Sequence, residues 1–236
     1  DHLRSIKNND EIKKIKKAAN LGDETFKHIL KIIKSGVTER AVGYEIESFI
    51  KLKGAEISFK PIVAFGKNAA IAHHQTGNTK LKKGDFVLLD FGAKFDNYCS
   101  DMTRTIFLGK PTRKQEDIYK VVLAAQQKAV DFINSCLRKG QKIKSKEIDK
   151  VARNYIKSKG YKDIPHSLGH GIGLEVHEHP SLSPKSKDSL QEGMVFSIEP
   201  GIYIPGFGGV RIEDLYVVEK TGLRQITTSP KNLIKV

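Results

Sequence analysis

The sequence predicts an α+β protein built from two similar halves, and three observations support that expectation. Two amphipathic helical patterns precede strand-like runs early in the chain, and the same order of two helical patterns and strands recurs later. No low-complexity linker separates the two parts, so we expect one compact unit of 236 residues. Hydrophobic residues make up 39% of the chain and charged residues 29%, which is typical of globular domains.

The first half opens with a helical pattern from Asn9 to Ile33, where apolar residues recur every three or four positions. Gly36 ends this pattern, and Thr38 provides the cap of a second amphipathic helix. Runs rich in β-branched and aromatic residues follow, and they predict strands around residues 58–65, 85–91 and 98–107.

The second half begins at a capping box, in which Thr112 and Gln115 stand three residues apart. The helix that starts there is expected to reach about Leu137. A shorter helix is predicted for residues 145–158, and Gly160 ends it. The remaining sequence reads as strands separated by turns rich in glycine and proline.

The net charge of +14 raises the possibility of nucleic-acid binding. However, most of the basic residues are lysines spread along the chain, and the run "EIKKIKKAA" keeps its apolar residues on the opposite helical face. Arginine-rich stretches with interleaved aromatic residues are absent. We therefore do not expect nucleic-acid binding to be the main role.

Two further composition features bear on location. No apolar stretch approaches the roughly 18 residues that span a membrane, and no membrane association is expected. The two cysteines, Cys99 and Cys136, lack the CxxC spacing and predict neither a disulfide framework nor a thiolate zinc site. A reducing cytoplasmic environment is the expectation that follows.

Asp90 and Asp101 lie on either side of an expected hairpin turn in "LLDFGAKFDNYCSDMTRT". In a hairpin with a two- or four-residue loop, the numbers of directly opposite residues add to an odd value. The two aspartates therefore share one face, either opposite or diagonal to each other. Like charges placed in this way are destabilising, and a cation between them would reverse that effect. The alternative is that one aspartate is exposed and the other caps the turn.

Histidines and glutamates elsewhere strengthen the interpretation as a metal site. Six of the eight histidines fall within "AIAHHQTGN" and "PHSLGHGIGLEVHEHP", and such clustering among glycines indicates an assembled site. Glu199 closes an apolar strand in "FSIEPGIYIPG", and Glu213 lies inside another in "VRIEDLYVV". Carboxylates with a single imidazole suit Mn²⁺, Fe²⁺, Co²⁺ or Zn²⁺ better than copper.

Five of these residues, in order and with their flanking motifs, resemble the metallopeptidases of the pita-bread fold. The resemblance runs from about residue 12 to the end of the chain and rests on Asp90 in "LLDFGA", Asp101 in "SDMTRT", His170 in "GHGIGLEVHE", Glu199 in "SIEPGIY" and Glu213 in "VRIED". It implies the pita-bread (creatinase/aminopeptidase) fold, with two similar α+β halves around a curved antiparallel sheet. It also implies residues 1–236 as a single metallopeptidase catalytic domain, without the N-terminal domain usual in relatives.

The resemblance further implies two divalent metal ions held by these five side chains. Asp101 and Glu213 would bridge the ions, Asp90 would hold one of them, and His170 and Glu199 would hold the other. Mn²⁺ is the first expectation, with Co²⁺, Zn²⁺ or Fe²⁺ as alternatives. Cys99 lies between the aspartates, but the family pattern assigns it no role, and we interpret it as a small buried hydrophobe.

The flanking motifs are similar to the branch that contains aminopeptidase P and prolidase, which cleave the Xaa-Pro bond. The three accessory histidines and the arginine of that branch match His73, His166, His177 and Arg211. The spacing selects His73, although the family often has proline before it where this chain has alanine, and it leaves His74 outside the site.

The resemblance also implies how these residues would act. Glu199 would serve as general base and acid, and His166 and His177 would stabilise the oxyanion and position the substrate. Arg211 precedes Glu213 by two residues, so on a strand both face the same side, where the guanidinium could bond the carboxylates.

The expected activity is hydrolysis of the Xaa-Pro bond at the N-terminus of peptides or in dipeptides, with a possible homodimer as the assembly. Methionine aminopeptidases share the five ligands and are the nearest alternative. A catalytically inactive pita-bread binding module is the other alternative.

Overall fold

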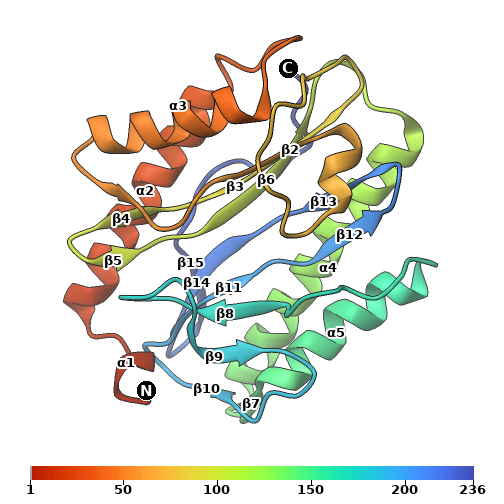
Figure 1. Ribbon diagram of the computed structural model, residues 1–236. Coiled ribbons are helices and arrows are strands. Elements are labelled where there is room, and N and C mark those ends of the chain that lie inside the picture. Colours follow the sequence, from red (N-terminus) through yellow and green to blue (C-terminus); the bar gives the residue numbers. More distant parts are fainter. Residues whose placement is uncertain (1) are drawn as a thin grey trace.

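The computed structural model describes residues 2–236 and consists of helix pairs packed against antiparallel strands (Figure 1). The helices are α1 (His2–Ser5), α2 (Asn9–Ile29), α3 (Glu39–Leu52), α4 (Arg113–Arg138) and α5 (Ser145–Ser158), with a short 3₁₀ helix η1 (Gly66–Ala70). The strands are β1 (Glu56–Ile57), β2 (Ile62–Phe65), β3 (Phe86–Phe91), β4 (Ala93–Phe95), β5 (Tyr98–Cys99), β6 (Met102–Phe107), β7 (Ile143–Lys144), β8 (Gly169–Gly171), β9 (Glu178–Leu182), β10 (Ser189–Leu190), β11 (Val195–Ile198), β12 (Gly201–Ile204), β13 (Gly208–Arg211), β14 (Asp214–Glu219) and β15 (Gly222–Gln225).

In the first half, α2 and α3 pack against the sheet β2-β3-β6. Phe26 and Ile29 of α2 and Ile46 of α3 meet Val87 and Leu89 of β3 in one hydrophobic cluster. Because these helical residues recur every three or four positions, they form one apolar stripe that faces the sheet. The smaller sheet β1-β4-β5 continues this half toward α2.

In the second half, α4 and α5 pack together; α4 contacts β12, β13 and β15, and α5 contacts β7 and β9. The capping box predicted for α4 is present, with Thr112 Oγ1 accepting from Gln115 N and Gln115 Oε1 accepting from Thr112 N. The strands form a five-stranded sheet of order β15-β14-β11-β8-β9, the hairpin β12-β13 and the short pair β10-β7. The order of helix pair and then strands thus recurs as predicted.

The two halves join where β6 contacts β13 and β14. Glu213 N donates to Thr103 O at 3.1 Å, and Thr105 Oγ1 donates to Arg211 O at 3.0 Å. Behind this junction, Arg104 forms a fully buried ion pair with Asp214 at 2.6 Å. Removing either partner would leave a buried unpaired charge, which costs about 3–5 kcal/mol. The junction is therefore held by charged groups as well as by backbone bonds.

The hairpin parity argument agrees with the observed register. Asp90 pairs with Thr103 across β3 and β6, and the turn at Asp96 and Asn97 has positive φ angles of 46° and 67°. This two-residue loop places Asp101 diagonally from Asp90 on the same face. The expected continuous strand 98–107 is interrupted before Met102. A Cβ on Gly92 would lie 1.8 Å from Ser100 O, so the two strands approach very closely at that point.

Two element boundaries differ from the sequence prediction. The first long helix ends at Ile29 rather than Ile33, because the following residues continue in tighter turns, with Ile32 N donating to Ile29 O. Ile33 is nevertheless buried, so the apolar period continues past the helix end. The strand expected at 58–65 is regular only from Ile62, since Pro61 has no N–H to donate to a ladder.

Within residues 2–236, no helix combines the length and the apolar character that crossing a bilayer requires.

Candidate active site

A cavity of about 510 Å³ is lined by residues from both halves, and it contains all nine residues that the sequence analysis selected. They come from segments far apart in the chain: the loop after η1, the β3–β6 hairpin, the loop before β8, β8 itself, the loop between β8 and β9, and the ends of β11 and β13. The nine residues are His73, Asp90, Asp101, His166, His170, His177, Glu199, Arg211 and Glu213.

The four acidic residues of the cavity lie at strand ends or at breaks between strands. Asp90 lies on β3, and Asp101 lies in the break between β5 and β6. Glu199 directly follows β11, and Glu213 lies between β13 and β14. These positions leave the backbone anchored in a sheet while the carboxylates reach into the cavity.

His170 on β8 stands among the carboxylates. Its Nε2 lies 3.4 Å from Glu199 Oε1, 3.6 Å from Asp101 Oδ2 and 3.9 Å from Glu213 Oε1. Asp101, His170 and Glu213 each offer one ligand atom within 4.8 Å of the others. One ion could therefore contact all three side chains after small rotations.

The tautomer of His170 follows from its surroundings. Nδ1 lies 3.1 Å from Gly171 O, and because a carbonyl only accepts, Nδ1 carries the hydrogen. Burial, together with the neighbouring His177, lowers the pKa of His170 to about 4. The ring is then neutral near pH 7 and turns the lone pair of Nε2 toward the carboxylates, as a metal-binding imidazole does.

The acidic groups repel one another in a water-poor setting. Burial raises the pKa of Asp101 well above its ordinary value, and the charges of Glu213 and Asp90 raise it further. Burial and the charge of Glu213 raise the pKa of Glu199 in the same way, and burial with the charge of Asp90 raises the pKa of Glu213 to about 8. A cation at this position would favour the ionised forms of all of them.

Three oxygens of the cluster have no hydrogen-bond partner in the part of the chain that the structure describes: Asp90 Oδ1, Asp101 Oδ1 and Glu213 Oε1. Buried polar atoms of this kind are rare unless a ligand or an ion satisfies them. Together with the lone pair of His170, these hard oxygen donors fit a divalent cation of the Mn²⁺ to Zn²⁺ group.

Arg211 and Thr103 organise the carboxylates from one side. The Arg211 guanidinium donates through Nη2 to Asp90 Oδ2 and through Nε to Thr103 Oγ1 at 3.1 Å. Thr103 in turn donates to Glu213 Oε2 at 2.7 Å. Arg211 Nε also lies 4.0 Å from Glu199. The guanidinium thus acts directly on Asp90 and through one hydroxyl on Glu213.

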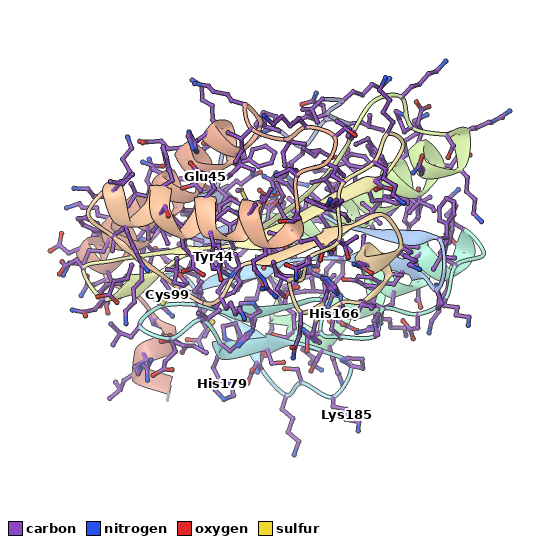
Figure 2. The ribbon with its side chains drawn as sticks, turned by 45° about the horizontal axis from the view of Figure 1, so that its top comes forward. Tyr44, Glu45, Cys99, His166, His179 and Lys185 are labelled. Carbon is purple, nitrogen blue, oxygen red and sulfur yellow. The ribbon has the colours of Figure 1, made fainter. Side chains whose placement is uncertain are left out.

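Both ring nitrogens of His166 are engaged. Nδ1 lies 2.7 Å from Ser167 O, so it carries the hydrogen, and Nε2 lies 2.7 Å from the Tyr203 hydroxyl. Arg211 donates to the same hydroxyl at 2.9 Å, which leaves the hydroxyl hydrogen for His166. Burial, followed by the Arg211 charge, lowers the pKa of His166 to about 3 and keeps the ring neutral. Figure 2 shows His166 inside the molecule, whereas Lys185 projects from its edge.

Of three further histidines near the site, His177 and His73 line the cavity and His74 does not. The His177 ring lies edge-on to His170 at 4.3 Å between centroids, and no protein group among residues 2–236 hydrogen-bonds it. His73 lines the cavity, whereas the adjacent His74 faces away and bonds Glu39 at 2.9 Å.

Cys99, labelled in Figure 2, lies outside the cavity lining. Its buried thiol contacts Leu174 O.

The sequence reasoning missed several groups that shape the site. Thr103 on β6 follows Asp101 by two positions, and the alternation of side chains along extended backbone could have identified it. Tyr203 carries no comparable sequence signal, because its contact with His166 depends on how β12 packs. The apolar wall was also missed; it is formed by Phe59, Ile62, Pro165 and Val176.

The sequence model of metallopeptidase family M24 matches residues 13–220. The chain is 45% identical to an uncharacterised peptidase of Bacillus subtilis over 236 residues, covering 99% of this chain and 65% of that protein. It is 44% identical to an Xaa-Pro dipeptidase of Pyrococcus horikoshii over 234 residues, covering 98% of this chain and 65% of that protein.

Two solved structures superpose on the whole chain. An Xaa-Pro dipeptidase from Bacillus anthracis matches with a TM-score of 0.93 at 46% identity, covering 100% of this chain and 65% of that one. An X-Pro aminopeptidase from Thermotoga maritima matches with a TM-score of 0.94 at 36% identity, covering 100% and 66%. The chain thus spans just under two thirds of the length of the relatives that it matches.

We predict that Thr103→Val weakens Mn²⁺ binding about 10- to 100-fold, because the hydroxyl that orients Glu213 and satisfies Arg211 is lost. Isothermal titration of the metal-stripped protein measures this change directly. Thr105→Val is the matched control: Thr105 is also buried on β6, but its hydroxyl bonds only the backbone of Arg211. Unchanged Mn²⁺ affinity in Thr103→Val, or equal losses in both variants, would contradict the assignment.

Proposed function

We propose that this chain, which belongs to metallopeptidase family M24, hydrolyses the peptide bond that precedes proline in dipeptides or at the N-terminus of peptides. The observation that carries the proposal is the convergence of four carboxylates and one neutral imidazole, with unpartnered buried oxygens, in a single cavity. The choice of an Xaa-Pro substrate is supported by relatives at 36–46% identity that are Xaa-Pro dipeptidases and an X-Pro aminopeptidase.

Two divalent ions fit the proposed site, with Mn²⁺ as our first candidate. Asp101 and Glu213 would bind both ions, Asp90 would hold one, and His170 and Glu199 would hold the other. When bound, such ions polarise a carbonyl oxygen and make water nucleophilic near neutral pH. The close acidic pairs and the raised pKa values of Asp101 and Glu213 support this arrangement.

Glu199 is the residue that we assign to proton transfer. Its carboxylate lies within 3.4 Å of both His170 Nε2 and Ser197 Oγ, and burial raises its pKa. A carboxylate at this position can accept a proton from water and pass it to a leaving group within hydrogen-bond reach. Glu199 takes a proton from the water that attacks the carbonyl carbon and delivers it to the prolyl nitrogen as the carbon–nitrogen bond breaks.

His177 is the residue that we assign to the developing oxyanion. Its ring has no hydrogen-bond partner within residues 2–236, so an N–H remains available to the substrate oxygen. His166 is held differently, because its hydrogen already goes to Ser167 O. We therefore assign His166, together with Tyr203 and Arg211, to shaping the substrate site rather than to donating to the oxyanion.

The apolar wall of the cavity supports a preference for proline. The carbon surface comes from Phe59, Ile62, Pro165 and Val176, and it suits the proline ring, which has no N–H that needs a hydrogen-bond partner.

We also propose that residues 1–236 form the catalytic domain and that the protein acts in the cytoplasm. A homodimer is the assembly that we retain from the family resemblance.

The direct test of the function compares two peptide classes. We expect purified protein with Mn²⁺ to cleave an Ala-Pro dipeptide or an Ala-Pro-Xaa peptide and to leave a Met-Ala peptide largely intact. A chelator should abolish the cleavage, Mn²⁺ should restore it, and Asp101→Ala should lack it. Asp117→Ala, which changes an exposed aspartate on α4, is the control that keeps full activity. Preferred cleavage of Met-Ala would favour a methionine aminopeptidase, and no cleavage of either peptide would favour an inactive binding module.

We predict that His177→Ala retains its full metal content but loses about 10²–10³-fold in turnover, by analogy with other oxyanion donors. Metal analysis and steady-state kinetics on the same sample separate the possible roles of this residue. His179→Ala is a suitable control, since the His179 ring is half exposed and bonds Asp188. Unchanged turnover would show that His177 is a solvated loop residue, and a missing ion would make it a metal ligand; either result refutes the assignment.

A further inference from the structure

The segment that brings His73 to the cavity has little regular structure of its own. After η1, residues 71–77 form neither helix nor strand. On the cavity side, Arg211 Nη1 donates to Ala72 O at 3.2 Å. A loop of this kind keeps a single conformation only if contacts on the side away from the cavity also hold it.

Glu39 provides such an anchor. It is the first residue of α3, its side chain is fully buried, and its carboxylate accepts four hydrogen bonds. Oε1 accepts from Phe65 N at 2.9 Å and Asn68 Nδ2 at 2.8 Å, before and within η1. Oε2 accepts from His74 Nε2 at 2.9 Å and Gly77 N at 3.0 Å. One carboxylate thus connects the end of β2 and the η1 helix to the middle and the end of the loop, and the N-terminus of α3 favours its charge.

His74 is the loop residue that connects this anchor to the cavity. His73 is an exposed residue that lines the cavity, whereas the side chain of the adjacent His74 is only 12% exposed and bonds the fully buried Glu39. Since the Glu39 carboxylate accepts hydrogen bonds, His74 Nε2 carries the hydrogen in this contact. Because His73 and His74 share one short stretch of backbone, the bond from His74 to the buried Glu39 restrains the backbone that carries His73.

We propose that Glu39 and His74 are positioning residues whose hydrogen bond holds the adjacent His73 in its place in the cavity. The two histidines in "AIAHHQTGN" then have different roles: His73 faces the substrate, and His74 binds Glu39. This inference rests on the proposed function, because His73 can only be positioned for a reaction that the chain performs.

A double-mutant cycle tests the inference. We expect His74→Ala to lower kcat/KM for the Ala-Pro peptide about tenfold or more, because small misplacements of an active-site group are costly. In a His73→Ala background the same change should have almost no further effect, since there is no ring left to position. A purely structural role would lower kcat/KM by the same factor in both backgrounds.

Two matched variants separate positioning from general loosening of the loop. Asn68→Ala removes another donor to the same carboxylate but leaves the His74 bond in place, so its kcat/KM should stay near wild type. His74→Gln keeps an N–H near the position of Nε2 and should recover much of the lost activity. Metal content and the thermal midpoint are measured for every variant, because Glu39 itself is too deeply buried to be replaced without risk to folding.

The outcomes are distinct. A wild-type protein that fails to cleave Xaa-Pro peptides would overturn the proposed function, and this inference with it. With an active wild type, the inference is supported by a loss in His74→Ala that disappears in the His73→Ala background, with metal content unchanged and recovery in His74→Gln. It is overturned by equal effects in both backgrounds, by an equal loss in Asn68→Ala, or by full activity of His74→Ala.

Discussion

Repulsion among four largely buried carboxylates is the constraint on which this site depends. Asp90, Asp101, Glu199 and Glu213 face one cavity, and the guanidinium of Arg211 is the cation among the residues that line it. Arg211 binds Asp90 directly, whereas Asp101 and Glu213 keep oxygens without partners among residues 2–236. Groups in this state favour protonation unless a cation compensates them. A divalent cation in the cavity would therefore relieve a repulsion that the arrangement of carboxylates itself creates.

The fold meets this constraint by dividing the acidic residues between its halves. The β3–β6 hairpin supplies Asp90 and Asp101, and the second half supplies Glu199 and Glu213. No short segment has to carry the whole charge, and the cluster forms only when the halves join at β6. The buried pair of Arg104 and Asp214 lies behind that junction, and Arg104 also donates to Glu213 O at 2.6 Å. The site is therefore complete only when the junction between the two halves is formed.

Local patterns in the sequence predicted much of this structure. Capping at Thr112 predicted the start of α4, and hairpin parity placed Asp90 and Asp101 on one face. The end of α2 was not predictable in the same way, because the apolar period records burial and continues into non-helical turns. Contacts between distant segments, such as Tyr203 with His166, leave no local signature. The motif match to a known family selected His73 over His74; in the structure His73 lines the cavity, whereas His74 bonds Glu39.

The number of metal ions bound per chain tests the central claim most directly. Metal-stripped wild-type protein is titrated with Mn²⁺ by calorimetry, and the bound metal is then counted by elemental analysis of the desalted complex. The account predicts two ions per chain, with binding accompanied by proton release because carboxylates of raised pKa must ionise. Binding of one ion per chain, or of none, would contradict it.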